Sequence, residues 1–455
     1  MAAEDWVKYA VWWQVYPLGF LGAEEQALPA GSRPVHRLGD MIGWLDYAVQ
    51  MGVSGIALGP VFSSETHGYD TVDYFTIDPR LGDDGDFDAL VSAAHERGLR
   101  MLLDGVFNHV GRGFPAFQRV LAEGPDASTA SWFQLSWPGA GEAGSDDGGG
   151  HRSGWPAEPD YRDFEGHHRL VALNHDVPAV VGHVTEVMKH WLDRGADGWR
   201  LDAAYAVPPE FWKAVLPAVR AAHPDAYIVG EVIHGDYAGT VREGGLDSVT
   251  QYELWKAIWS SLNDRNFYEL SASLERHNDL LETFAPLTFV GNHDVTRIAS
   301  RLEEPRFLPH ALAILFTVGG TPSVYYGDEQ GFRGVKEDRV GGDDAVRPRF
   351  PRNPGELALS GRDVYRLHQQ LIGIRRRHPW LHRASTEVLT LSNEQILYRS
   401  AAGRSELTVG LNLSAVPAEF TAAGFAGPAR RTVIAGTADV STGLVVPPRG
   451  WAILE

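Results

Sequence analysis

The sequence predicts an α/β fold, a (β/α)8 barrel with a small domain inserted after the third strand and a C-terminal antiparallel β-domain. Apolar runs alternate with amphipathic stretches along most of the chain, which is typical of β/α units. In four segments an apolar run stops at an acidic side chain. Parallel barrels carry their chemistry at the carboxyl ends of the strands. The four runs are Leu102–His109, Gly198–Asp202, Ile228–Val232 and Phe289–Asp294.

Eight apolar runs are candidates for the barrel strands, which is the strand number of a (β/α)8 barrel. Helices are expected between them. In Phe87–Arg97, for example, Leu90 and Ala94 recur at helical spacing, and Gly98 follows as a stop signal. The strand candidates are Val11–Val15, Gly55–Leu58, Met101–Gly105, Gly198–Leu201, Tyr227–Gly230, Asp247–Gln251, Leu287–Val290 and Ser323–Tyr326.

Two departures from this alternation predict the other domains. Residues 110–172 are too long for an ordinary loop and contain a Gly- and Asp-rich stretch, so we expect an inserted domain between two parts of the barrel, residues 1–109 and 173–379. After the amphipathic helix Val364–Arg377, short strand-like runs predict a β-sandwich domain over residues 380–455. These runs are Gln395–Arg399, Leu407–Leu411, Arg431–Ile434, Leu444–Val446 and Trp451–Leu454.

The composition excludes several classes of function. The 455 residues include 40 Lys and Arg against 59 Asp and Glu, without a long basic stretch, so nucleic acid is not an expected partner. The chain has no Cys, which excludes disulfides, thiol catalysis and Cys-ligated zinc and suits a reducing compartment. Acids stand where a signal peptide would be basic, and no apolar run approaches a membrane span. We therefore expect a cytoplasmic protein with no membrane partner.

The acids at the strand ends predict the chemistry. Parallel strands bring Asp104, Asp202, Glu231 and Asp294 to one rim of the barrel. Several carboxylates in one cleft are what acid–base and nucleophilic work on a glycosidic bond requires. Taken alone, each motif has a structural interpretation, such as an Arg–Asp ion pair or a solvated acid at a strand end. The ordered set favours a glycosidase.

In this order and at these barrel positions, the four runs resemble the four signature regions of the α-amylase superfamily of retaining glycoside hydrolases, glycoside hydrolase family 13. The resemblance covers nearly the whole chain. Leu173–Pro178 is similar to the additional signature that closes the inserted domain of that family. His67–Asp70 is similar to the loop that lines its first sugar subsite.

The resemblance implies that Asp202 is the nucleophile, Glu231 the acid/base and Asp294 a stabiliser of the oxocarbenium-like transition state. Arg200 lies two residues before Asp202, so both side chains point to the same side of the strand. A guanidinium that close is expected to lower the pKa of Asp202 by roughly 1–3 pH units and keep it nucleophilic. The apolar residues before Glu231 favour the protonated form that an acid catalyst needs.

A second set of residues is expected to bind the sugar. His109 and His293 flank acid-bearing motifs and are expected to hold hydroxyls of one sugar, although a lone histidine is more often a packed core residue. Tyr69 offers a ring face to the C–H surface of the sugar. Asp104 is expected to support the site rather than do chemistry, for instance by bracing Arg200.

The resemblance also implies ligands on either side of this sugar. His67 and Asp70 would bind in the first subsite, and Asp343 and Arg347, in the polar loop after the eighth strand, would bind a further sugar. An Asp such as Asp70 grips the terminal sugar in exo-acting relatives, which predicts a closed cleft and a preference for short substrates. In the alternative interpretation Asp70 only supports its loop, and the cleft is open at both ends.

No cofactor and no metal ion are expected. Many secreted members of the superfamily bind calcium through the Asn of the first signature, acids in the inserted domain and a Lys-His that follows the nucleophile. Here Asp202 is followed by Ala203, Ala204 and Tyr205, so a contributor is missing. Because calcium prefers six to eight oxygen ligands, the loss of one family ligand argues against that site.

Three functions remain open at this point. The leading one is double-displacement hydrolysis of α-1,4-glucosidic bonds in short maltooligosaccharides or related α-glucosides. The second is a transglycosidase, either a 4-α-glucanotransferase or a maltose/trehalose-isomerising enzyme, that uses the same residues with a sugar as acceptor. The third is a carbohydrate-binding protein without catalysis, which the intact set of catalytic residues disfavours. In each case the expected partner is a small α-glucoside.

Overall fold

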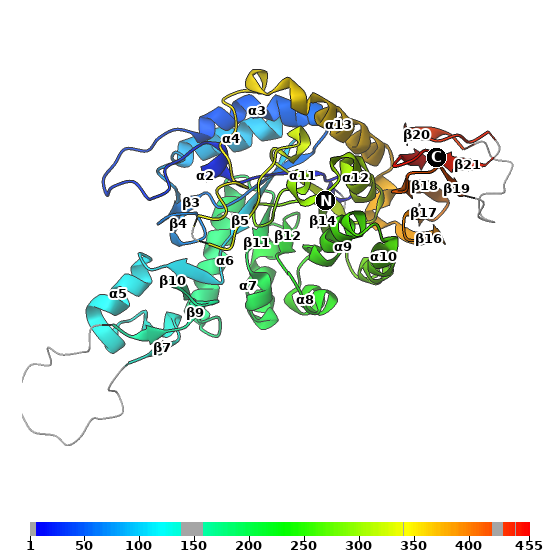
Figure 1. Cartoon of the computed structure of the whole chain (residues 1–455). Helices are drawn as coiled ribbons and strands as arrows, with labels where there is room; N and C mark the ends of the chain where they lie inside the picture. Colours follow the sequence, from blue (N-terminus) through cyan, green and yellow to red (C-terminus); the bar gives the residue numbers. More distant parts are fainter. Residues whose placement is uncertain (1–5, 138–157, 340, 421–430, 442) are drawn as a thin grey trace, which may run out of the picture.

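The computed structural model describes residues 6–137, 158–339, 341–420, 431–441 and 443–455 (Figure 1). Eight parallel strands form the central sheet in the order β13-β12-β11-β5-β2-β1-β15-β14, and a bridge between Thr250 and Leu287 joins its two ends. The strands are β1 (Trp12–Val15), β2 (Gly55–Leu58), β5 (Arg100–Gly105), β11 (Gly198–Leu201), β12 (Tyr227–Gly230), β13 (Ser248–Val249), β14 (Leu287–Phe289) and β15 (Thr321–Tyr325). The predicted parallel barrel is thus confirmed.

Strand β13 is shorter than the predicted run Asp247–Gln251, and its end has a local cause. The side chain of Gln251 accepts hydrogen bonds from the backbone N–H groups of Glu253 and Leu254 and thereby caps helix α9 (Tyr252–Asn263). A residue that caps a helix has left the strand ladder, so the strand ends before it. Strand β15 begins two residues before the predicted Ser323 and ends one residue before Tyr326.

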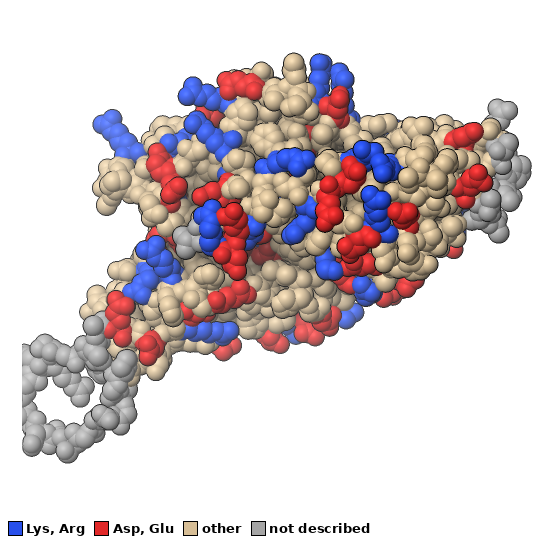
Figure 2. Space-filling model, viewed as in Figure 1, with Lys and Arg blue, Asp and Glu red and all other residues tan. Residues whose placement is uncertain are grey.

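Helices cover the outside of the barrel (Figure 1). Helix α4 starts three residues before the predicted Phe87, because Asp83 and Asp86 form a capping box at its N-terminus. On the face in Figure 2, acidic and basic side chains are interspersed. The longer helices are α3 (Leu38–Met51), α4 (Asp84–Glu96), α6 (Pro178–Asp193), α7 (Pro209–Ala222), α8 (Tyr237–Gly244), α9, α10 (Phe267–Leu281), α12 (Leu308–Thr317) and α13 (Arg362–Arg377). None of the helices in the described ranges is long and apolar enough to cross a membrane.

The segment between β5 and β11 projects from the barrel as a separate lobe (Figure 1). Its described part has a three-stranded sheet in the order β6-β10-β9, and β10 pairs antiparallel with both neighbours. The predicted Gly- and Asp-rich stretch, residues 139–154, lies outside the described residues. The elements are β6 (His109–Gly111), α5 (Pro115–Glu123), β7 (Leu135–Ser136), β8 (Asp160–Tyr161), β9 (Asp163–Phe164) and β10 (His167–Ala172). The domain limits at residues 110 and 172 stay a prediction.

The C-terminal part consists of antiparallel strands, as predicted. Five strands pair in the order β16-β17-β18-β22-β20, and two more, β19 and β21, pair separately. Apolar side chains of both sheets, including Leu397 and Phe420, are buried in one cluster. The strands are β16 (Ser385–Leu391), β17 (Gln395–Ala402), β18 (Ser405–Asn412), β19 (Ala418–Phe420), β20 (Val433–Gly436), β21 (Leu444–Val446) and β22 (Trp451–Leu454). The sequence did not predict β16 and β19.

Candidate active site

The strand register brings the four acids to one rim of the barrel. Arg200 of β11 lies directly opposite Asp104 of β5, and Leu201 lies opposite Gly230 of β12. Asp202 and Glu231 follow these two strands by one residue, so their side chains meet at the same level. Asp294 is the fifth residue after β14 and lies in the loop that leaves the same end of the barrel.

Arg200 is the centre of this cluster. One guanidinium nitrogen, Nη1, donates to both oxygens of Asp104 at 2.7 Å and to Asp202 at 3.2 Å. The other, Nη2, lies 2.7 Å from Oε1 of Glu231. All four side chains are buried. Asp104 therefore braces Arg200, as expected. The two terminal nitrogens of the guanidinium contact Asp202 and Glu231, one each.

Two further donors fix the carboxylate of Glu231. The backbone N–H of Ala203 donates to its Oε2 at 3.1 Å, and the hydroxyl of Tyr252 donates to its Oε1 at 3.1 Å. Asn292 in turn donates to the oxygen of Tyr252 at 2.8 Å. The bond from Ala203 requires a sharp turn directly after Asp202, because Ala203 has a φ of 45°, in the left-handed region that non-glycine residues rarely adopt.

The electrostatics of the cluster differ from the sequence expectation. Burial and the Glu231 carboxylate raise the pKa of Asp202 well above its usual range, and this outweighs the lowering by Arg200. Burial also raises the pKa of Asp104, again against Arg200. The expectation of a lowered pKa for Asp202 is therefore wrong in the unliganded site. One guanidinium shared among three carboxylates leaves negative charge in excess, which favours uptake of a proton by the set.

Asp294 lies in a different environment. Arg347 donates to its Oδ1 at 2.8 Å, and Nε2 of His293 lies 2.9 Å from its Oδ2. Burial raises the pKa of Asp294, but the electrostatic interaction and hydrogen bond with His293, together with the charges of Arg347 and Arg200, hold it below its usual range. Asp343 lies 3.1 Å from Arg347. The structure thus brings the two predicted loop residues to the edge of the carboxylate cluster.

The backbone of the loop that carries Arg347 is clamped on both sides of that residue. Arg297 donates through Nη2 to the carbonyl of Val346 at 2.9 Å, and the hydroxyl of Tyr326 donates to the carbonyl of Pro348 at 2.8 Å. Arg297 is fully buried. A clamp on both neighbours fixes where the Arg347 side chain starts, so it positions the guanidinium against Asp294.

Aromatic rings stack beside Asp294. The rings of Tyr69 and His293 are parallel with centroids 5.3 Å apart, and Tyr16 continues the stack on His293 at 6.3 Å. The Tyr69 hydroxyl bonds to His293 and donates to Asp104 at 3.3 Å. Gln14 fixes the other side of His293 through its Nδ1. Ring planes with hydroxyls at their edge are suited to the apolar faces and polar rims of a sugar.

An open cavity of about 810 Å³ continues from these rings to the surface. Tyr16, His67 and Arg347 form its inner wall, and residues 166–170 of the inserted lobe form part of its outer wall. Burial lowers the pKa of His67, so the ring is neutral near pH 7 and can both donate and accept a hydrogen bond. A volume in this range accommodates an oligosaccharide of several units.

Two of the predicted sugar ligands are engaged within the protein. Nε2 of His109 bonds to the carbonyl of Tyr69 at 3.0 Å, and Nδ1 bonds to the Asn108 side chain at 3.1 Å. Burial lowers the pKa of His109 to about 3. The Asp70 carboxylate accepts from the backbone N–H and the hydroxyl of Thr66 at 3.1 and 2.5 Å. Direct binding of a sugar by these two residues stays a prediction, while their observed contacts hold the loop of Tyr69.

The structure shows site residues that the sequence did not predict. Tyr16 and Tyr252 could have been found, because each follows a predicted strand directly, where the acids also lie. Asn292 is part of the fourth signature run and also could have been found. Tyr326 could have been found in the same way, because it ends the predicted strand Ser323–Tyr326, whereas the contribution of Arg297 depends on where a distant loop passes.

The position at which relatives bind calcium does not fit a cation here. Asn108 is bonded to His109, and with His175 and Arg162 it lines a cavity of about 70 Å³. Burial lowers the pKa of His175, and the charge of Arg162 lowers it further. Calcium requires six to eight oxygen ligands, whereas the side chains of this cavity offer one carboxylate, Asp176, and two amides, and the guanidinium of Arg162 repels a cation.

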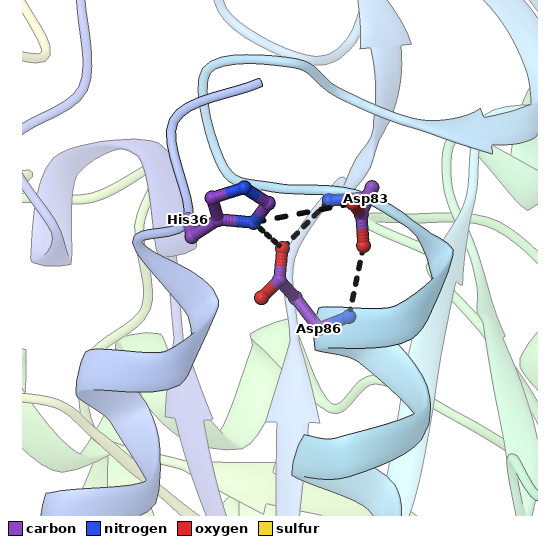
Figure 3. A group of neighbouring side chains, drawn as sticks. All are labelled: His36, Asp83 and Asp86. Atoms are coloured by element: carbon purple, nitrogen blue, oxygen red, sulfur yellow. Dashed lines mark hydrogen bonds and ion pairs between the residues drawn. The ribbon is translucent and has the colours of Figure 1, made fainter. Parts of the chain in front are cut away.

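Within the described ranges, one other group of side chains could approach a cation, and Figure 3 shows its three members, of which His36 and Asp83 are exposed. Nδ1 of His36 lies 2.6 Å from Asp86 and 4.0 Å from Asp83. The two acids already cap helix α4, since Asp83 accepts from the N–H of Gly85 and of Asp86. These contacts account for the arrangement without a metal ion.

Comparisons with known proteins agree with this geometry. The family model for the α-amylase catalytic domain matches residues 14–370. A cyclomaltodextrinase of Geobacillus thermopakistaniensis is 30% identical over 446 residues, which are 92% of this chain and 71% of that protein. An intracellular maltogenic amylase of Bacillus subtilis is 31% identical over 74% of this chain and 58% of its own length.

A solved structure is similar over the whole chain. The cyclic α-maltosyl-(1→6)-maltose hydrolase of Arthrobacter globiformis, in complex with that sugar, has a TM-score of 0.79 and 26% identity, and the match covers 100% of both chains. The barrel and its rim of carboxylates define a glycosidase. The chain belongs to the α-amylase family, glycoside hydrolase family 13.

The raised pKa of Asp202 predicts how stability depends on pH. The folded protein holds a proton on this residue above about pH 4, where an unfolded Asp releases it, so the native state loses stability as the pH rises. Asp202→Asn cannot titrate and should escape this loss. We expect its Tm to exceed that of the wild type by about 2–4 °C at pH 8 and by less at pH 4.5 in thermal melts. If the Tm of Asp202→Asn minus that of the wild type falls as the pH rises, the lowering of the Asp202 pKa by Arg200 outweighs the effect of burial.

The cavity beside Arg162 predicts metal independence. Because its side chains do not suit calcium, excess chelator should change neither the activity nor the Tm of the protein. The measurement compares turnover and thermal melting before and after dialysis against chelator, with added calcium as the control. Loss of either property on chelation, restored by calcium, would contradict this expectation.

Proposed function

We propose that the protein is a retaining hydrolase of α-1,4-glucosidic bonds in short maltooligosaccharides or related α-glucosides, with Asp202 as nucleophile and Glu231 as acid/base. The observation that carries this proposal is the arrangement around Arg200, which presents both carboxylates at one level of the rim. Asp294 complements them from the side of His293 and Arg347. Two carboxyl groups with a third at the sugar are what a double displacement needs.

In the first step Asp202 attacks the anomeric carbon and forms a glycosyl-enzyme, while Glu231 gives its proton to the glycosidic oxygen as that bond breaks. Asp202 must be ionised for this attack, so the proton that the coupled carboxyls take up has to reside on Glu231 when the substrate is bound. Ala203 and Tyr252 hold the Glu231 carboxyl in place during the transfer. Asp294 keeps its negative charge and stabilises the oxocarbenium-like transition state between the two positions of the anomeric carbon.

In the second step Glu231 takes a proton from water, and the resulting nucleophile attacks the anomeric carbon from the side that the leaving group has vacated. The bond to Asp202 breaks, and the product retains the α configuration. Arg200 accompanies both steps, because it compensates the carboxylate charge that moves between Asp202 and Glu231.

The cavity beyond the first sugar supports an oligosaccharide as substrate. It begins at Tyr16, His67 and Arg347 and extends about 810 Å³ toward the surface, so the site has room for further sugar units on this side. This space argues against a cleft closed by Asp70, whose carboxylate faces Thr66. The similar proteins include a cyclomaltodextrinase and an intracellular maltogenic amylase, which supports short α-glucans met in the cytoplasm.

Transglycosylation by the same residues is the second candidate, with a sugar hydroxyl in place of water in the second step. The site residues serve both reactions, so the choice depends on which acceptor reaches the glycosyl-enzyme. Chromatography and mass analysis of the products from maltose through maltoheptaose, sucrose and trehalose distinguish the two: products longer than the substrate would identify a transferase.

The assigned roles predict the effect of removing each carboxylate. Asp202→Ala should lower kcat by at least about 10⁴-fold, because no glycosyl-enzyme can form, while the fold persists. Glu231→Ala should lower kcat on maltotriose by about 10²–10⁴-fold. Azide should restore activity of Glu231→Ala on an aryl glucoside, whose leaving group needs little acid help. Near wild-type turnover by a folded Asp202→Ala protein would refute the assignment.

The dimensions of the cleft predict the preferred substrate length. We expect kcat/KM per chain end to be higher on maltose to maltopentaose than on soluble starch, because the inserted lobe narrows the approach of a long polymer. Initial rates on a series of defined length provide the measurement. Rapid loss of iodine staining of amylose, with early products of mixed length, would instead show that long polymers reach the site and are cut within the chain.

A further inference from the structure

We propose that Glu165, at the tip of the β9–β10 hairpin, determines acceptor-side specificity by forming, with Tyr205, the wall against which the leaving-group sugar binds. The inference rests on the proposed function, because it takes Glu231 as the group that protonates the leaving oxygen. The hydroxyl of Tyr205 donates to Oε1 of Glu165 at 2.8 Å, which joins the inserted lobe to the barrel beside the carboxylates.

Tyr205 is held next to Glu231 by the backbone. The left-handed turn at Ala203 folds the chain back after Asp202, so that the N–H of Tyr205 donates to the carbonyl of Glu231 at 3.2 Å. From the loop after β12, the ring of His234 lies 5.7 Å from the ring of Tyr205. Tyr205 is half-buried, so part of its side chain remains accessible.

Glu165 occupies a backbone conformation that disfavours its residue type. Phe164 pairs with His167, so Glu165 and Gly166 form a two-residue turn, with φ values of 53° and 83°. Turns of this kind favour Asn or Asp followed by Gly, because both positions are left-handed. A Glu at this position costs free energy that an Asn would not. The longer side chain carries its carboxylate across to Tyr205, and a strained residue with a specific contact at a cleft points to a functional constraint.

The position of the pair relative to the reacting bond identifies the acceptor side. A leaving sugar must lie beyond Glu231, because this residue gives it a proton, and Tyr205 and His234 flank Glu231 there. The cavity of Tyr16 and Arg347 lies beside Asp294 and takes the other part of the substrate; residues 166–170 of the same hairpin line it, so Glu165 stands at the border between the two sides. Glu165 is exposed, so its carboxylate can accept hydrogen bonds from sugar hydroxyls while it holds Tyr205.

The hairpin is anchored on its other side by the active site itself. The ring of Phe164 stacks on His109, with centroids 4.6 Å apart and an interplanar angle of 16°. This contact fixes the root of the turn, while Tyr205 fixes its tip. The Glu165–Tyr205 wall is therefore fixed at both the root and the tip of the turn. A fixed wall can favour binding of a sugar over water on the acceptor side.

The test compares two substrates with leaving groups of very different size. Maltotriose has a sugar that reaches the Glu165–Tyr205 wall, whereas the fluoride of α-glucosyl fluoride is too small to reach it. Glu165→Asn suits the left-handed turn but loses the carboxylate, and Tyr205→Phe loses only the hydroxyl. For both variants we expect kcat/KM to fall about tenfold on maltotriose and to stay near the wild-type value on α-glucosyl fluoride. The ratio of transfer to hydrolysis products should also fall.

Arg265→Asn is the matched control. Arg265 is another non-glycine residue with a positive φ, 50°, but it lies in the turn between α9 and α10 and faces Glu394 of the C-terminal part. This variant should leave both substrates unaffected. The Tm of Glu165→Asn should equal or exceed that of the wild type, which separates a lost contact from unfolding.

Two outcomes would overturn the proposal: equal losses on both substrates, which would make Glu165 a purely structural residue, or no loss on either. Failure of the proposed function is distinguishable, because the wild-type protein itself would then turn over neither maltotriose nor α-glucosyl fluoride.

Discussion

The active site depends on one buried guanidinium. Arg200 bonds to Asp104, Asp202 and Glu231 at once, and without it three carboxylates would face one another in a space from which water is largely excluded. Even with it the negative charge is in excess, which is why the pKa of Asp202 rises. The parallel register of β5 and β11 makes this possible, because it places Arg200 directly opposite Asp104. A one-residue slip would turn either side chain out of the barrel.

Most of the fold and the central acids could be predicted because they follow a rule of local pattern. Buried parallel strands are continuous apolar runs, and the residue at the end of such a run lies at the rim. Asp202 and Glu231 obey this rule, and so do Tyr16 and Tyr252, which went unnoticed because tyrosine after an apolar run suggests packing. Strand β16 escaped prediction since its place depends on a distant partner, Asn278 of α10, which bonds to the backbone of Thr386.

What the sequence could not provide is the balance of competing interactions. The spacing of Arg200 and Asp202 predicted their contact correctly, but the sign of the pKa change depends on how many other acids share the same arginine. His109 shows the same limit. Its neighbourhood in sequence suggested a sugar ligand, whereas in the fold both ring nitrogens bond to Tyr69 and Asn108. Arg297 could not be recognised at all, because its partner Val346 is set by the path of a loop 49 residues away.

The contacts of His109 also explain how the inserted lobe and the barrel cooperate. His109 is the first residue of β6 and thus belongs to the lobe's sheet, yet its ring supports the loop of Tyr69 and stacks on Phe164. Burial lowers its pKa to about 3, so the ring stays neutral and these contacts persist at any pH at which the enzyme is folded. A displacement of the lobe must therefore disturb Tyr69, and through it His293 and Asp104. The lobe is thus a structural part of the catalytic rim. Its hairpin can act on the substrate because His109 anchors both the hairpin, through Phe164, and the loop of Tyr69.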